Sequence, residues 1–98
     1  MTTAQTILTQ LGGNRFCAMT GASGFIGMDD GLMFALPQRM CKNKANKVVV
    51  KLDDSDTYRV EFFSLRGATV KAISTHKMVY ADRLAQTISE QTGLAVRL

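Results

Sequence analysis

The sequence predicts an α+β fold, in which an antiparallel sheet of about five strands carries an N-terminal and a C-terminal helix packed on one face. Three observations predict it. Apolar residues recur at helical spacing near both ends of the chain, they alternate with polar residues along several runs in the middle, and short turns join the later runs. Short turns join antiparallel neighbours, because a parallel pair needs a crossover of roughly a dozen residues. The 98 residues are enough for a single domain.

The N-terminal helix is predicted from apolar residues on one helical face: Ala4, Ile7, Leu8 and Leu11. Thr2 and Gln5 have the spacing of a capping box, in which each side chain bonds the backbone N–H of the other residue. Gly12 and Gly13 end the helix, because glycine tolerates the backbone turn that follows a helix. We expect this helix to pack on the protein's own sheet.

Five strands are expected in the middle of the chain, over residues 15–20, 32–36, 47–52, 58–66 and 69–75. The glycine-rich segment 21–31 has the composition of a loop or a wide hairpin connection. Pro37 ends the second strand, because proline has no N–H to donate to a sheet. Polar turns at 53–56 and 66–68 separate the later strands.

The strand at 58–66 has an alternating pattern, with an apolar face formed by Tyr58, Val60 and Phe62. Phe63 follows Phe62 directly, which breaks the alternation and predicts a β-bulge.

A C-terminal helix is predicted over residues 81–92, with an apolar stripe formed by Ala81, Leu84, Ala85 and Ile88. Asp82 lies in its first turn, where the helix dipole stabilises a negative charge. Gly93 and Leu94 have the pattern of a glycine C-cap with its hydrophobic contact.

Positive charge is concentrated in one segment. The chain has 12 Lys and Arg against 8 Asp and Glu, a net charge of +4. Residues 31–52 contain basic residues and no acidic residue. Outside this segment, the chain holds more acidic than basic side chains. Within this segment we expect residues 38–47 to form a flexible, amide-rich and cationic connection.

This charge predicts a small non-enzymatic protein that binds nucleic acid, most simply a single strand. Lys47 and Lys51 share one strand face, which Arg59 extends on the next strand and Lys71 on the one after. The expected phosphate contacts are Arg39, Lys42, Lys44, Lys47 and Lys51, with Arg59 assisting. Phe63 would stack on a base if the bulge turns it outward. A solvated lysine face that protects the strands from aggregation is the alternative.

One segment has the form of a dinucleotide-binding motif. TGASGFIG at 20–27 resembles the phosphate-binding turn of extended short-chain dehydrogenases, where a helix opens inside the motif. Here a strand-like run ending at Pro37 follows, and residues 38–52 lack the acidic partner that binds the ribose. We therefore expect a glycine-rich connection and no dinucleotide cofactor.

No catalytic or metal-binding constellation is predicted. His76 is the single histidine, and without paired cysteines it does not make a standard zinc site. The carboxylates of Asp53, Asp54 and Asp56 lack the longer ligand series of a calcium loop and fit a solvated turn. Ser23 has no obvious base. We therefore expect neither an enzyme nor a bound cofactor or metal.

The two cysteines, Cys17 and Cys41, are expected to be free thiols, as in a reducing cytoplasm. The first residues lack the basic and apolar regions of a signal peptide. No apolar stretch approaches the roughly 20 residues of a membrane span. We expect a cytoplasmic protein without a membrane partner, and a chain this small would be stabilised further by forming a homodimer.

Short blocks are spaced along nearly the whole chain: QLGGNRF at 10–16, MTGA at 19–22, LP at 36–37, KNK at 42–44, DTYRVEF at 56–62, VYAD at 79–82 and TGL at 92–94. They resemble small proteins of tailed bacteriophages and prophages that have no settled activity. The resemblance implies a phage context in a bacterial host cell, and it brings no site residues. A module that binds or inhibits a host or phage protein is therefore the main alternative to nucleic-acid binding, and a structural piece of the virion is a third.

Overall fold

The computed structural model describes residues 2–53 and 56–94. Its elements follow in the order α1 (Thr3–Leu11), α2 (Asn14–Thr20), β1 (Ser23–Met28), β2 (Gly31–Ala35), η1 (Gln38–Met40), β3 (Lys47–Leu52), β4 (Tyr58–Arg66), β5 (Thr69–Val79), η2 (Ala81–Arg83) and α3 (Leu84–Thr92), where η marks a 3-10 helix. The strands form one antiparallel sheet in the order β1-β2-β3-β4-β5, so each strand pairs with its neighbour in sequence. The predicted α+β fold is confirmed.

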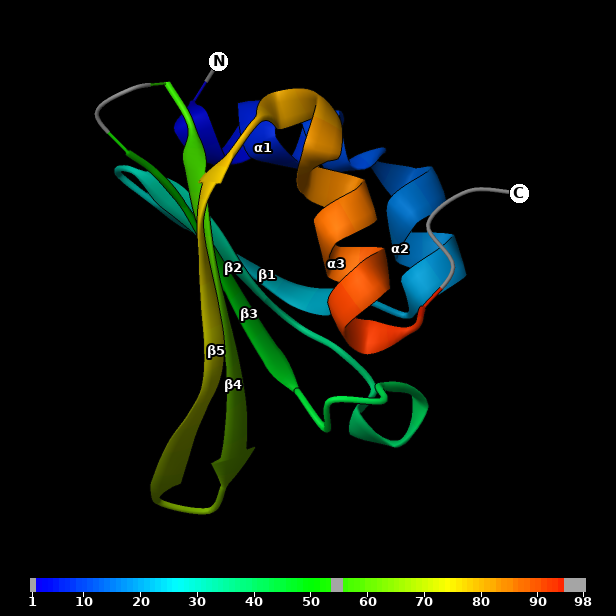
Figure 1. Cartoon of the computed structure of the whole chain (residues 1–98). Helices are drawn as coiled ribbons and strands as arrows, with labels where there is room; N and C mark the ends of the chain where they lie inside the picture. The colour runs from blue at the N-terminus through cyan, green and yellow to red at the C-terminus, as the bar shows by residue number, and fades with distance from the viewer. Residues whose placement is uncertain (1, 54–55, 95–98) are drawn as a thin grey trace.

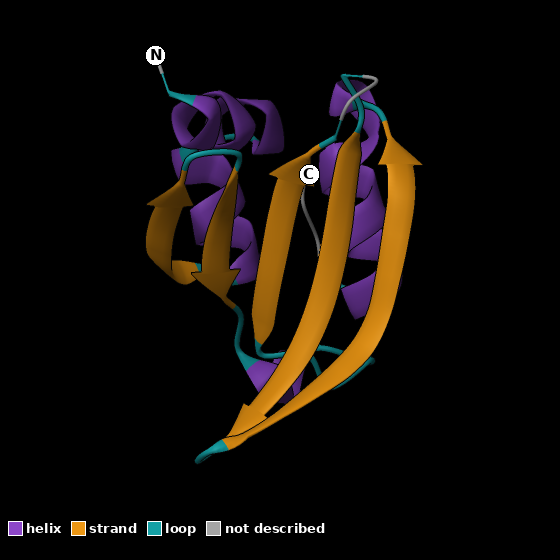
Figure 2. Ribbon diagram, turned by 90° about the vertical axis from the view of Figure 1, so that its left-hand side faces the viewer, coloured by secondary structure: helices purple, strands orange, loops and turns teal. Residues whose placement is uncertain are grey.

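The helices and the sheet form two layers. All the α-helices of the described residues lie on one side of the sheet, and its other side is open (Figure 1). The helix α1 packs on β1 and β2 and also contacts α3. Figure 2 shows the helices behind the five strands, whose last two members extend beyond the helical layer as a long hairpin.

The core lies between the two layers. Its largest fully buried side chains come from the helices (Ile7, Phe16, Leu84 and Ile88) and from the strands (Phe34, Val48, Val50, Val60 and Phe62). Phe16 packs edge-on against Phe34 with ring centroids 5.6 Å apart, an arrangement that aromatic pairs favour. Burial of these side chains stabilises the fold by roughly 25 cal/mol per Å² of apolar surface removed from water.

The prediction of a strand over residues 15–20 is wrong, because this segment forms the helix α2. Phe16 and Thr20 lie four residues apart, so a helix turns both toward the core, and both are buried. The Thr20 hydroxyl donates a hydrogen bond of 2.7 Å to the carbonyl of Phe16. Gly21 ends the helix with φ at 76°, in the left-handed region. The segment is too short for its apolar pattern to separate a helix from a strand.

Part of the glycine-rich segment 21–31 is also a strand, because residues 23–28 pair with β2. The pairing shifts register near Gly24, whose φ of 63° suits a bulge at a glycine. At Gly27 an added Cβ would lie 3.2 Å from the Cβ of Ala4, so the missing side chain lets α1 approach the sheet. An edge strand pairs on one side only, which is why it tolerates two glycines.

The other strands agree closely with the prediction. The bounds of β3 and β4 are as predicted. The pairing of β4 with β5 shifts between Phe62 and Phe63, the position of the predicted bulge, but the extra residue is Ile73 on β5. The prediction that β4 itself loses its alternation at Phe63 is therefore wrong, because buried and half-buried residues alternate from Tyr58 to Phe63. The strand β5 continues to Val79 instead of ending at residue 75, because it stays paired with β4 as far as Tyr58.

The predicted helix ends are present. Thr2 and Gln5 form the capping box of α1, and Gly93 caps α3 with φ at 77°. The predicted C-terminal helix begins as the 3-10 turn η2. The thiols of Cys17 and Cys41 are both free, as expected. Among the residues that the structure describes, no helix has the length and apolar composition needed to cross a membrane.

Candidate nucleic-acid interface

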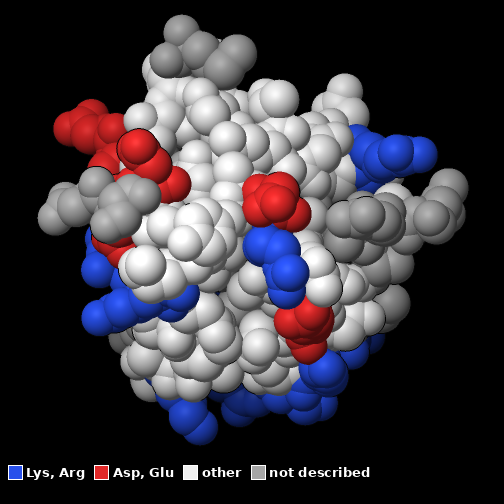
Figure 3. Space-filling model, turned by 45° about the horizontal axis from the view of Figure 1, so that its top comes forward, with Lys and Arg blue, Asp and Glu red and all other residues white. Residues whose placement is uncertain are grey.

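The up-and-down strand order sorts charged side chains to opposite ends of the sheet. The connections β2–β3 and β4–β5 lie at one end, and β1–β2 and β3–β4 lie at the other. The first end, here called the basic end, carries Arg39, Lys42, Lys44 and Arg66. The second end carries Asp29, Asp30, Asp53 and Asp56. Figure 3 shows acidic side chains gathered at the upper left of the molecule and basic ones along its lower margin.

The connection between β2 and β3, here called the basic loop (residues 36–46), is anchored to the core. Cys41 is only 2% exposed and Ala45 is fully buried. The N–H of Lys42 donates a 2.8 Å hydrogen bond to the carbonyl of Thr92, at the end of α3. The structure therefore differs from the flexible connection expected over residues 38–47, because small buried side chains and backbone hydrogen bonds hold the loop in one place.

Two amide side chains join the basic loop to β4. The Asn46 side chain donates to the carbonyl of Leu65 and accepts from its N–H, both at 2.8 Å. Gln38 Nε2 donates to the carbonyl of Lys44 at 2.9 Å and to Ser64 Oγ at 3.1 Å. These hydrogen bonds therefore hold the basic loop against the β4–β5 hairpin, and the two segments form facing walls.

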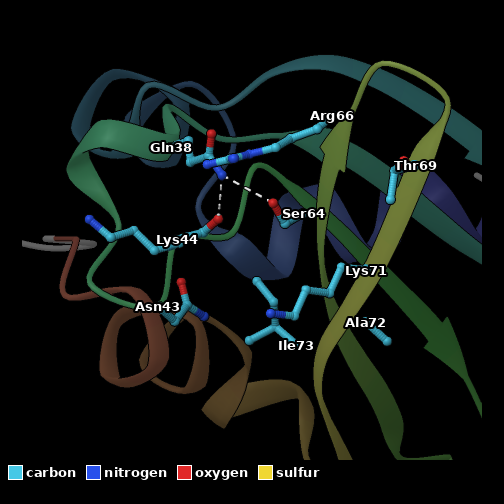
Figure 4. Close-up of a pocket in the computed structure, with 9 residues that line it drawn as sticks. All are labelled: Gln38, Asn43, Lys44, Ser64, Arg66, Thr69, Lys71, Ala72 and Ile73. Atoms are coloured by element: carbon cyan, nitrogen blue, oxygen red, sulfur yellow. Dashed lines mark hydrogen bonds between the residues drawn. The ribbon is translucent and has the colours of Figure 1, made fainter.

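A cavity of about 540 Å³ lies between these walls (Figure 4). Its lining consists of Gln38, Asn43, Lys44, Ser64, Arg66, Thr69, Lys71, Ala72 and Ile73. Three cationic residues from three elements belong to this lining: Lys44 from the loop, Arg66 from β4 and Lys71 from β5. Figure 4 shows the carbonyl of Lys44 on the inner side of the loop, while its ammonium group points away from the other lining residues. None of these lining residues is acidic. The cavity therefore concentrates positive charge, as a site for anions requires.

Asn43 adds an unpartnered hydrogen-bond donor to this cavity. Its Oδ1 accepts from the N–H of Ala45 at 3.1 Å, which fixes the orientation of the amide. Its Nδ2 is buried and has no hydrogen-bond partner among the described residues. A buried donor left without an acceptor costs roughly 1–3 kcal/mol, so an acceptor supplied by a ligand would remove that cost.

The residues predicted from the sequence divide between the two faces of the sheet. Cross-strand partners share a face. Ser64 pairs with Lys71, and both lie on the helix side, where the cavity opens. Lys47 pairs with Phe63, and Lys51 pairs with Arg59, on the open side. Of the seven predicted residues, only Lys44 lines the cavity, while Arg39 and Lys42 are exposed elsewhere on the basic loop.

The open face has mixed charge. Arg59 lies 3.9 Å from a carboxylate oxygen of Asp53 and 3.7 Å from one of Glu61. These carboxylates offset its charge, which leaves less positive potential for a phosphate than the cavity offers. Phe63 is half-buried beside Lys47 on this face. The predicted stacking role of Phe63 stays a prediction.

Sequence reasoning did not single out the cavity residues Asn43, Ser64, Arg66 and Thr69 as a site. Arg66 and Thr69 lie in or beside a predicted turn and pair with each other in the hairpin. The available signal was the strand order, because an up-and-down sheet brings the β2–β3 and β4–β5 connections to one end. This signal can be used only once the up-and-down order of the strands is known.

The histidine and the described carboxylates that the sequence analysis considered lie outside the lining of this cavity. His76 Nε2 lies 3.1 Å from Ser74 Oγ, and the imidazole packs edge-on against Phe62. Within residues 2–53 and 56–94, no group of His, Cys, Asp and Glu is arranged to hold a metal ion. Asp54 lies outside the described residues. The segment 20–27 enters from a helix and continues as a strand, the reverse of the order in a dinucleotide-binding motif.

Comparisons of the chain with known protein families, with curated proteins and with solved structures find no match. The function proposed for the chain therefore depends on the chemistry of its own residues.

Proposed function

We propose that the protein is non-enzymatic and binds single-stranded nucleic acid at its basic end. The observation that supports this function is the cavity, whose lining includes Lys44, Arg66 and Lys71 from three elements and no acidic residue. Phosphate is the anion that every nucleotide carries, and cations that neutralise it release counterions, which drives binding.

The anchored loop strengthens the proposal. Ordering a long cationic side chain on binding costs roughly 0.5–1.5 kcal/mol, and a mobile backbone adds to that cost. Here the backbone of Lys44 is already held, because its carbonyl accepts from Gln38 and its N–H donates to the carbonyl of Cys41. Arg39 and Lys42 lie on the same loop and extend the positive surface beyond the cavity.

A single strand fits this geometry better than a duplex. The cavity is recessed between the loop and the hairpin, and Ala72 and Ile73 are also among its lining residues. A flexible strand can bend a nucleotide into such a recess, whereas a duplex keeps its bases stacked and resists bending over short lengths.

The test is fluorescence anisotropy with labelled single-stranded and double-stranded oligonucleotides at low and physiological salt. The variant Lys44→Gln/Arg66→Gln/Lys71→Gln is compared with Lys47→Gln/Lys51→Gln/Lys77→Gln, which removes the same charge outside the cavity. We expect the cavity variant to bind single strands at least about tenfold more weakly and its salt slope to fall by about 0.7 for each phosphate contact that is lost. We expect the matched variant to lose much less.

Two outcomes would contradict the proposal. Absence of binding at low salt, where weak electrostatic contacts are strongest, overturns nucleic-acid binding itself. A larger loss in the matched variant moves the binding surface to Lys47 and Lys51 on the open face, as the sequence alone suggested.

A protein-binding module is the second candidate, and one observation favours it. Met78 and Tyr80 are 60% and 59% exposed near the acidic end, far more than apolar side chains in the core. Exposed aromatic and methionine side chains are enriched in protein interfaces. On this reading the partner is a host or phage protein, and Tyr80→Ser abolishes its capture while leaving oligonucleotide binding unchanged.

A further inference from the structure

We propose that the cavity recognises the terminal phosphomonoester of a nucleotide at the end of a strand, in preference to the phosphodiesters inside it. This inference rests on the proposed function and names the part of the strand that the cavity takes. Three features of the cavity carry it: its charge, its hydrogen-bond donors and the side along which hydrogen bonds join its two walls.

The charge of the cavity matches a dianion. Arg66 and Lys71 line a space of about 540 Å³ together with the backbone of Lys44, and none of the lining residues is acidic. A phosphomonoester carries a charge of about −1.5 to −2 at pH 7, whereas an internal phosphodiester carries only about −1. Arg66 also offers the planar fork that bonds two phosphate oxygens at once. A terminal phosphate therefore gains more from this site than an internal one.

The cavity also carries neutral hydrogen-bond donors beside its cations. Asn43 Nδ2 is buried without a partner. Ser64 Oγ accepts from Gln38, which leaves its own hydrogen free to donate into the cavity. Thr69 contributes a second hydroxyl to the lining. A phosphomonoester presents three non-bridging oxygens to these donors and to the cations, and a phosphodiester presents two.

The shape of the cavity suits the end of a chain. Figure 4 shows the hydrogen bonds of Gln38 to Lys44 and Ser64 running along one side, between the basic loop and β4. Asn46 joins the same two walls through Leu65. A strand passing through would need both sides open, whereas a strand end needs a single entrance. The volume lies within the range of sites that hold small ligands, which suits one nucleotide with its phosphate.

The experiment compares oligonucleotides of one sequence that carry a hydroxyl or a phosphate at the 5′ or 3′ end, with the fluorophore at the opposite end. Adenosine monophosphate and adenosine serve as unlabelled competitors. We expect one end-phosphorylated oligonucleotide to bind at least about tenfold tighter than its hydroxyl form, the change expected for an added charge-assisted contact. The monophosphate should compete and adenosine should not.

Two variants tie this preference to the cavity. Asn43→Asp keeps the acceptor for Ala45 and almost the same shape, but replaces the free donor with a negative charge. Arg66→Gln removes the planar guanidinium group. Because Arg66 is exposed, this variant tests the inference even if the Asn43 variant does not fold. Both should remove the preference for the end phosphate, while Lys47→Gln on the open face should keep it.

The outcomes separate this inference from the proposed function. Equal affinity for phosphate and hydroxyl ends, with weaker binding in the cavity variant, overturns the inference and supports the proposed function. Binding of the free monophosphate without binding of any oligonucleotide supports the cavity chemistry and overturns the proposed function. A preference that survives in both Asn43→Asp and Arg66→Gln overturns the inference, because the phosphate is then recognised elsewhere.

Discussion

Asn46 and Leu65 exchange two hydrogen bonds, both 2.8 Å long, in which the side chain of one residue pairs with the backbone of the other. The backbone of Asn46 also donates to the carbonyl of Phe63 at 3.0 Å. These bonds continue the pairing of β3 with β4 beyond Lys47, the first residue of β3. The basic loop is therefore attached to the strand that carries Arg66, and the cations of the cavity are positioned before any ligand binds.

Removing this attachment should weaken anion binding without changing any charge. Asn46→Ala leaves the N–H and the carbonyl of Leu65 without partners in a half-buried place, so we expect the free energy of unfolding to fall by about 1–3 kcal/mol. Urea denaturation measures this loss, and anisotropy at a temperature where the variant is folded measures affinity. Gln10→Ala, on the exposed face of α1, is the control and should change stability by less than about 0.5 kcal/mol. Unchanged oligonucleotide affinity in Asn46→Ala would show that the loop needs no attachment.

Two substitutions of Lys44 separate the effect of its charge on binding from the effect of its backbone conformation on stability. Its φ of 64° lies in the left-handed region, which costs a residue with a side chain roughly 1–2 kcal/mol and costs glycine far less. Glycine adds about 0.5–1 kcal/mol of unfolded-state entropy, so we expect Lys44→Gly to be more stable than Lys44→Ala by about 0.5–1 kcal/mol. Both variants should lose the same affinity for anions. If the alanine variant were the more stable one in thermal denaturation, the left-handed conformation of residue 44 would be contradicted.

Gly31 should be the glycine of the sheet least tolerant of substitution. A Cβ added there would overlap the carbonyl oxygen of Val50 on the neighbouring strand β3. We expect Gly31→Ala to destabilise the protein by about 1–3 kcal/mol or to prevent folding, because backbone has to move to relieve the overlap. Gly67→Asn is the control, since nothing lies within 4 Å of an added Cβ and asparagine tolerates the φ of 56°. Equal melting temperatures for the two variants would refute this account of Gly31.

Burial raises the pKa of the Cys41 thiol above its ordinary value of 9.0. The unfolded chain then loses this proton at a lower pH than the folded chain does. The contribution of Cys41 to stability is therefore fully present below the pKa of the unfolded thiol and decreases as the pH rises above it. We expect the difference in unfolding free energy between the protein and Cys41→Ala to shrink between about pH 8.5 and pH 10, because thiols titrate near 8.5 in unfolded chains. A difference that grows over this range would contradict the assigned direction.

Much of the fold was predictable because local signals and packing agree. The capping box at Thr2, the glycine cap at Gly93 and the bounds of β3 and β4 all follow from short-range chemistry. The helix α2 was not predictable, because the few apolar side chains of a seven-residue segment fit either the helical or the strand period. The strand β1 was missed because tertiary pairing overrides the low strand preference of glycine.

The candidate site was predictable only in part. The charge of residues 31–52 pointed to the basic loop and so to Lys44. Arg66 and Lys71 join Lys44 in one lining only because the up-and-down strand order brings the β4–β5 hairpin beside that loop. Asn43 matters only because its side-chain donor is buried without a partner. Composition carries no information about burial, so the sequence alone does not reveal the buried donor of Asn43.

The central claim is that single-stranded nucleic acid binds in the cavity on the helix side of the sheet. Amide chemical shifts, followed by NMR during titration with the tighter-binding end-phosphorylated oligonucleotide and with its hydroxyl form, test it most directly. We predict that the largest shifts occur in residues 38–46 and 64–73, and that they are larger with the end phosphate. Shifts concentrated at Val49, Phe63 and Thr75 on the open face, with the cavity residues unmoved, would contradict the account.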